Sequence, residues 1–175
     1  MIATSPQLKL VKPRIIATTL MVLSFGLNTS VAAKTPISEG TRQGVTWKTY
    51  LLNTNYVKPI VRGEETRRIY LANTETHNSS SGISRRTDLL QCSTSEPFVS
   101  FNITESGRGI TIVHYINPGG DSGAFPASHN LYWAVCHQVY EPWKRDLVTQ
   151  AKQLGYSLNL TERQTKIPHR RSETR

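Results

Sequence analysis

The stretch FVSFNITESGRGITIVHYI, residues 98–116, contains two segments of alternating apolar residues that flank a glycine-containing break. Val99, Phe101 and Ile103 fall on one face of the first segment, as a strand packed on one side requires. Val, Ile, Thr, Phe and Tyr dominate both segments, which favours strands over a helix. Gly107 and Gly109 suit the loop between them. The stretch therefore predicts a β-hairpin, around which we place the rest of the fold.

A cysteine lies on each side of this hairpin, at Cys92 and Cys136. An even pair of cysteines in a small exported domain is usually bridged, and a loop of this length predicts a stabilisation of about 4 kcal/mol. The alternative is a metal site, which has less support because neither cysteine has a partner at C-x-x-C spacing. We therefore predict a disulfide between Cys92 and Cys136.

The N-terminal 33 residues have the features of a secretory signal peptide. Lys9, Lys12 and Arg14 precede a mostly apolar stretch at residues 15–27, and small residues lead up to Ala33. An uncleaved membrane anchor is the alternative, but a membrane span needs roughly 20 apolar residues. The sequence predicts cleavage after Ala33, so that the mature protein is periplasmic or extracellular.

The formal net charge of +9 is concentrated at the two ends of the chain. Residues 34–162 carry 13 basic and 11 acidic side chains, while residues 163–175 carry five basic side chains and one acidic. We expect one globular domain at 34–162 with a flexible lead-in at 34–43, followed by a basic disordered tail at 163–175. The tail could contact an anionic polymer or a membrane surface, or remain solvated. No specific binding of nucleic acid is expected.

Further strands are predicted by alternation at residues 45–52, 56–62, 67–72, 89–93 and 131–137. Residues 73–86 are almost wholly polar and predict a surface loop. A single helix is expected to begin at Pro142, because Trp143, Leu147, Ala151 and Leu154 recur at helical spacing. The predicted fold class is α+β: an antiparallel β-sheet with one C-terminal amphipathic helix packed on it.

One short motif suggests an enzyme. Residues 120–123 read GDSG, and in this the chain resembles the nucleophile region of chymotrypsin-like proteases. The resemblance is limited to these four residues, and the chain after Ala33 is too short for the two barrels of that family. The implied hydrolase would use Ser122 as nucleophile and His77 or His114 as base.

Other chemistry has weaker support in the sequence. His114, Asp121, His129 and His137 lie within 24 residues, but without the spacing of a metal site. No motif for a cofactor is present, and no two carboxylates can be paired for glycoside hydrolysis. Exposed aromatic side chains could bind sugar or peptide, and the candidates are Tyr50, Tyr70, Tyr115 and Tyr132. We expect a non-enzymatic binding or structural component of the cell envelope or secretome, with the serine hydrolase as the alternative.

Overall fold

The computed structural model describes residues 34–62, 65–120, 123 and 125–169. These residues belong to one compact unit. The predicted signal peptide lies outside the described residues, as do Ser122 and residues 170–175 of the predicted tail.

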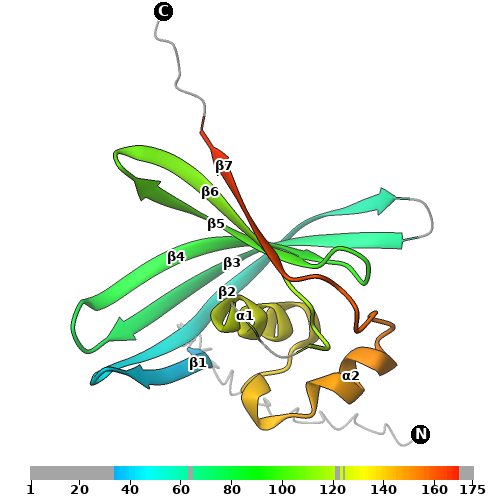
Figure 1. Cartoon of the computed structure of the whole chain (residues 1–175), viewed down its shortest axis with the longest axis horizontal. Coiled ribbons are helices and arrows are strands. Elements are labelled where there is room, and N and C mark those ends of the chain that lie inside the picture. The colour runs from blue at the N-terminus through cyan, green and yellow to red at the C-terminus, as the bar shows by residue number, and fades with distance from the viewer. Residues whose placement is uncertain (1–33, 63–64, 121–122, 124, 170–175) are drawn as a thin grey trace, which may run out of the picture. The chain divides into compact units, whose positions relative to one another are not determined.

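Seven antiparallel strands form one sheet in which neighbours in sequence are also neighbours in space (Figure 1). The strands are β1 Thr35–Arg42, β2 Val45–Arg62, β3 Glu65–Asn78, β4 Gly82–Cys92, β5 Phe98–Glu105, β6 Arg108–Tyr115 and β7 Arg163–Pro168. The predicted hairpin at residues 98–116 is confirmed as β5 and β6. Ser106 and Gly107 have positive φ at its turn.

The long β2–β3 hairpin corrects two predictions. A turn was expected at residues 53–55, but β2 continues through them with bulges after Leu51 and after Tyr56. Residues 73–86, expected as a surface loop, instead form the end of β3, a short turn and the first half of β4. Polar residues can form these strands because their side chains bond across the ladder: Thr49 Oγ1 lies 2.9 Å from Thr76 Oγ1.

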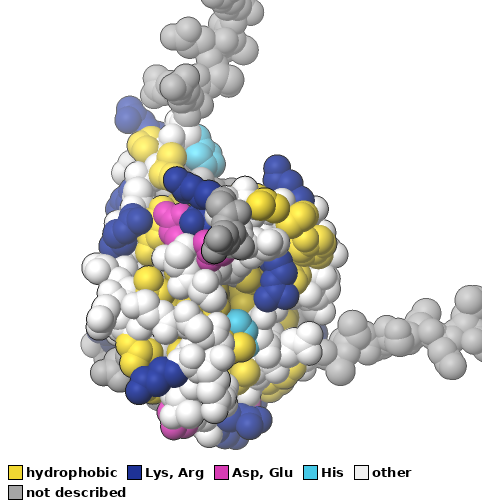
Figure 2. Space-filling view, turned by 90° about the vertical axis from the view of Figure 1, so that its right-hand side faces the viewer, with side chains coloured by type: hydrophobic (Ala, Val, Ile, Leu, Met, Phe, Trp, Pro, Cys, Tyr) yellow, Lys and Arg dark blue, Asp and Glu magenta, His cyan; other side chains and the backbone are white. Residues whose placement is uncertain are grey.

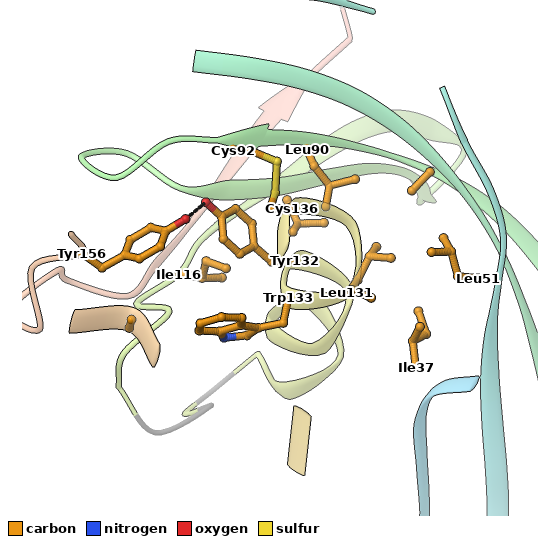
Figure 3. Packing of buried hydrophobic residues seen from close by; sticks show 14 residues of the cluster. Ile37, Leu51, Leu90, Cys92, Ile116, Leu131, Tyr132, Trp133, Cys136 and Tyr156 are labelled. Carbon is orange, nitrogen blue, oxygen red and sulfur yellow. Dashed lines mark hydrogen bonds between the residues drawn. A yellow bond between two sulfur atoms is a disulfide. The ribbon is translucent and has the colours of Figure 1, made fainter. Parts of the chain in front are cut away.

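Helix α1, Pro126–His137, lies against one face of the sheet (Figures 1 and 3). The predicted strand at residues 131–137 is therefore wrong. Leu131, Tyr132, Trp133, Ala134 and Cys136 are all buried, so the helix is covered on most sides and lacks the apolar stripe that would identify it in the sequence. Pro126 in the first turn and left-handed Gln138 after the last turn mark its ends.

The predicted C-terminal helix is divided into two short pieces, the 3-10 helix η1 (Pro142–Lys144) and the α-helix α2 (Leu147–Gln153). Arg145 is extended between them, and Asp146 caps α2 by accepting a hydrogen bond from the Thr149 backbone N–H at 3.1 Å. The α+β class is confirmed, with the correction that α1 supplies the main helical cover of the sheet. Among the described residues, no helix has the length and apolar character needed to cross a membrane.

Both edges of the sheet are formed by segments that were expected to be flexible. The predicted lead-in at 34–43 is strand β1, where Ile37 is buried in the core. The first half of the predicted disordered tail is β7, which pairs with β6. The basic side chains of β7 contact the sheet: Arg163 lies over the ring of Tyr115 at 3.4 Å, and Lys166 pairs with Glu105 at 3.1 Å.

The predicted disulfide between Cys92 and Cys136 is confirmed. It joins the end of β4 to the last turn of α1, with 5.6 Å between the two Cα atoms, and both cysteines are buried in the core (Figure 3). The bridge therefore fixes the helix to the sheet at the centre of the hydrophobic core.

Candidate functional site

Trp47 on β2 lies where three hollows of the surface meet. The largest, which we call the tryptophan groove, has a volume of about 660 Å³ and lies between β1, the first turns of α1 and the η1–α2 segment. A second hollow of about 620 Å³ extends toward the β1–β2 and β3–β4 turns, and a third of about 260 Å³ extends between the sheet and α1. Trp47 lines all three, so the three hollows adjoin at this side chain.

The position of Trp47 depends on the strand opposite it. Trp47 pairs with Gly40 across the β1–β2 ladder, and its indole lies over the Cα of that glycine. A Cβ at position 40 would overlap the six-membered ring of the indole. Gly40 thus provides the space in which the indole lies.

A second tryptophan, Trp143 on η1, also lines the tryptophan groove, and its side chain is 41% exposed. Large aromatic side chains exposed in a hollow are typical of binding surfaces, because an aromatic ring offers a wide apolar face at low entropic cost. The remaining lining is mixed and consists of Ser38, Glu39, Gly120, Pro126, Ala127, His129, Asn130, Pro142, Arg145, Asp146, Leu147 and Val148.

The charged side chains of the tryptophan groove differ in whether they have partners. Glu39 pairs with Lys48 at 3.2 Å, and Asp146 accepts the capping hydrogen bond of α2, which lowers its pKa. Arg145 forms no ion pair with any other described residue. The described lining thus carries two carboxylates that have partners and one arginine without an ion pair.

His129 in the wall of the groove is 1% exposed, and neither ring nitrogen has a hydrogen-bond partner among the described residues. The carbonyl groups of Asn117 and Pro118 lie close to it but outside hydrogen-bonding geometry. Burial lowers the pKa of His129, although the charge of Glu162 acts in the opposite direction. An unpaired buried imidazole is uncommon, and both of its nitrogens are closed off from the solvent in the groove.

His114 and His77, the two histidines proposed as bases, both contact other polar side chains. Nδ1 of His114 lies 2.8 Å from Oγ of Ser128 and Nε2 lies 3.1 Å from Oε1 of Gln164, while its ring stacks on Phe125. Ser128 is buried and does not line any of the three hollows. Ser122, the nucleophile suggested by the GDSG motif, lies outside the described residues.

His77 belongs to an ion cluster centred on Glu75, whose side chain is 1% exposed. Lys34 and His77 contact Oε1 of Glu75, and Arg85 Nε donates to Oε2 at 2.8 Å. These three donors lower the pKa of Glu75 to about 2. Lys34, the residue expected to begin the mature chain, is thereby tied to the middle of the sheet.

A third histidine of the suggested metal site, His137, is half-buried at the end of α1, next to Cys136 in the sequence. Its Nε2 is 2.7 Å from the hydroxyl of Tyr156, which in turn lies 2.8 Å from the hydroxyl of Tyr132. Burial, helped by the charge of Arg68, lowers the pKa of His137 to about 4. Among the described residues, no three side chains of His, Cys, Asp or Glu are grouped to hold a metal ion.

The aromatic surface suggested by the sequence is not made of the four tyrosines. Tyr132 is completely buried, Tyr115 is covered by Arg163, and Tyr50 and Tyr70 are partly buried against His77 and Tyr56. The exposed face of the domain in Figure 2 carries its hydrophobic side chains in separate patches, with Lys and Arg spread among them.

Neither Trp47 nor Trp143 was predicted from the sequence to bind a ligand. Trp47 fitted the alternation of a strand, and Trp143 fitted the apolar stripe of the predicted helix, which placed both in the core. One feature of the sequence does separate Trp143 from the apolar stripe. Asp146 is a good N-cap residue, and a helix that begins after Asp146 does not include position 143.

Comparison of the chain with known proteins finds no matching family model, no matching curated protein and no matching solved structure. The function must therefore be argued from the geometry of the site.

Proposed function

We propose that this protein is exported and that its domain is a non-enzymatic binding module, which holds a carbohydrate chain in the tryptophan groove. The observation that carries the proposal is the pair of indoles, Trp47 and Trp143, in one groove whose other lining residues are a mixture of apolar and polar side chains. The apolar C–H face of a sugar ring packs well on an aromatic face, and its hydroxyl groups need polar partners at the ring edge.

The size of the recessed surface supports an extended ligand. Two further hollows open from the tryptophan groove at Trp47, one toward the hairpin turns and one beneath α1. A chain of several sugar units could follow this surface, whereas a single small ligand would fill only one part of it. A polymer of the cell envelope or of the extracellular space fits this arrangement.

The two carboxylates that line the groove support binding of a carbohydrate rather than its hydrolysis. Glycoside hydrolysis uses two carboxyl groups, one of which must be free to donate a proton. The acidic side chains that line the groove among the described residues are Glu39 and Asp146, and both have partners. The capping bond lowers the pKa of Asp146, which is opposite to the shift that a general acid needs.

Export is supported by two features. The first is the order of basic, apolar and small residues at the N-terminus. The second is the disulfide, because such bridges form and persist in oxidising compartments.

A glycan array followed by calorimetric titration tests the proposal. The wild-type protein is compared with Trp143→Ala and with Tyr56→Ala, since Tyr56 is an exposed aromatic residue on the projecting end of β2 (53% exposed). We expect binding of a linear oligosaccharide that Trp143→Ala weakens at least tenfold, by loss of a stacking contact of about 1 to 3 kcal/mol, while Tyr56→Ala binds like the wild type. Equal binding by Trp143→Ala, or no binding of any glycan by the wild type, would contradict the proposal.

A further inference from the structure

We infer that the carbohydrate enters the hollow of about 260 Å³ between the sheet and α1 by its terminal unit, and that this unit is an uncharged sugar. We call this hollow the hydroxyl pocket. The domain therefore binds the end of a carbohydrate chain rather than its middle. This inference rests on the proposed function and specifies how the same site recognises its ligand.

Four hydroxyl side chains cross the sheet in one row along the wall of the hydroxyl pocket. Ser38 of β1 pairs with Thr49 of β2. Thr76 of β3 pairs with Thr49 on one side and with Ser84 of β4 on the other. Residues that are paired directly in an antiparallel ladder have their side chains on the same face of the sheet, so the four hydroxyl groups form one polar strip.

The hydroxyl groups of this row are suited to the hydroxyl groups of a sugar. Oγ1 of Thr49 lies 2.9 Å from Oγ1 of Thr76, and because only one of the two donates in that bond, the hydrogen of the other is free to bond elsewhere. Ser84 is exposed. Each of these groups can both donate and accept a hydrogen bond, and so can each hydroxyl group of a sugar.

The hydroxyl row lies between Trp47 and the hydrophobic core on one face of the sheet. Trp47, Thr49 and Leu51 are alternate residues of β2, and Leu51 belongs to the core. Alternate residues of a strand share a face and are about 7 Å apart. A sugar ring stacked on Trp47 therefore has the hydroxyl row beside it, close enough for the next unit of the chain to reach it.

The hydroxyl pocket is closed at its inner end. Ile37 and Leu131 line it there, and each is a core residue with 1% of its surface exposed. Figure 3 shows them on facing elements, with Leu131 on α1 and Ile37 beside β1. Ala127 in the first turn of α1 lines the pocket from the helix side. A carbohydrate chain cannot pass through a pocket that ends at the core, so it must enter by one of its ends.

The electrostatics of the hydroxyl pocket favour an uncharged unit. Arg86 is the one charged residue among the described residues that line it. Its Nε lies 2.7 Å from Oδ1 of the buried Asp88, and its guanidinium lies 4.2 Å from the ring centre of Phe101. An anionic sugar would have to compete with Asp88 for this arginine, and a cationic sugar would lie beside a like charge.

Calorimetric titrations with neutral hexasaccharides test the role of the hydroxyl row. The probes are maltohexaose, xylohexaose and laminarihexaose. They are titrated into the wild type, Ser84→Ala, Thr76→Val and, as a control, Thr66→Val, which removes an exposed hydroxyl group at the start of β3. We expect the wild type to bind at least one hexasaccharide, and Ser84→Ala and Thr76→Val each to weaken that binding about fivefold, as the loss of one hydrogen bond would. Thr66→Val should bind like the wild type.

The number of protein molecules bound to a long chain tests the recognition of an end. For the hexasaccharide that binds most tightly, the titration is repeated with the linear polymer of the same sugar units, which is amylose, xylan or β-1,3-glucan. We expect saturation at one protein molecule per polymer chain, because each chain has only one end of the kind that is bound. A site that bound the middle of the chain would saturate at several protein molecules per chain.

The outcomes separate this inference from the proposed function. If Ser84→Ala or Thr76→Val binds like the wild type, or if several protein molecules bind to one polymer chain, while Trp143→Ala weakens binding, the proposed function stands and the inference is overturned. If the wild type binds none of the three hexasaccharides, the inference is overturned and the glycan array decides the proposed function.

Discussion

Gly40 on β1 leaves the space that the indole of Trp47 occupies on β2, and these two residues face each other in the β1–β2 ladder. Any larger residue at position 40 would push the indole away, because its Cβ would overlap the ring. A glycine within a strand weakens the strand slightly, so its presence here indicates that the position of the indole matters.

Gly40→Ala should therefore reduce binding without unfolding the domain. Alanine is tolerated in a strand at least as well as glycine, so we expect the thermal midpoint to remain within a few degrees of the wild type. The displaced Trp47 should change the near-ultraviolet circular dichroism, and oligosaccharide affinity should fall several-fold. Unchanged affinity together with a changed Trp47 signal would show that this indole does not contact the ligand.

The sequence predicted the hairpin at residues 98–116, the disulfide and the α+β class, because each depends on local alternation or on the parity of cysteines. It failed at residues 131–137, where most sides of α1 are covered and the helical period of apolar residues disappears. The segments at 34–43 and 163–168 are strands for a different reason. Their composition is polar, but the sheet edges supply the hydrogen bonds that stabilise them.

The candidate site could not be predicted because it depends on which aromatic residues remain exposed. Trp133 and Trp143 both lie in segments that the sequence predicted to pack in the core, yet Trp133 is fully buried and Trp143 is 41% exposed. That difference arises from the break at Arg145 and from the packing of α1, neither of which follows from the spacing of apolar residues.

Removal of the disulfide should destabilise the domain strongly. A bridge across a sequence separation of 44 residues is worth about 4 kcal/mol in the chain-entropy account. For the double variant Cys92→Ala and Cys136→Ala, we expect the thermal midpoint to fall by about 10 °C or more. An unchanged midpoint would indicate that α1 is held on the sheet by apolar packing alone.

Stability should decrease as the pH falls from about 6.5 toward 4. The pKa of His137 is about 4 in the folded protein against an ordinary value of 6.5, so protons bind preferentially to the unfolded chain in this range. The lowered pKa values of His114 and His129 act in the same direction, whereas burial raises the pKa of Asp88 and partly opposes them. His137→Gln should flatten the dependence of the thermal midpoint on pH, and an equally steep dependence in this variant would contradict the assignment.

The carboxylates of Glu65 and Glu75 should contribute only at more acidic pH. Both have a pKa of about 2 in the folded protein, Glu65 because Ser93, Thr94 and Ser95 donate hydrogen bonds to it. Their stabilisation is complete above the ordinary pKa of about 4.5 and is lost as the pH falls toward 2. Above pH 5 the histidine effect can thus be measured with little contribution from Glu65 and Glu75.

Export should produce a chain that begins at Lys34. We expect the intact mass of protein recovered from the exported fraction to correspond to residues 34–175 with one disulfide. The side chain of Lys34 contacts Glu75, so a chain trimmed further should lose this anchor of β1. A mass that includes residues 1–33 would refute cleavage at this position.

The most direct test of the binding site is hydroxyl-radical footprinting of the tryptophans with and without a saturating oligosaccharide. Trp133 is fully buried and serves as the internal reference, and Tyr56 reports an exposed aromatic residue away from the groove. The proposed site predicts that the oligosaccharide slows oxidation of Trp143 and Trp47 and leaves the rate at Tyr56 unchanged. Full binding with no protection of Trp143, or with protection at Tyr56 instead, would contradict a carbohydrate site in the tryptophan groove.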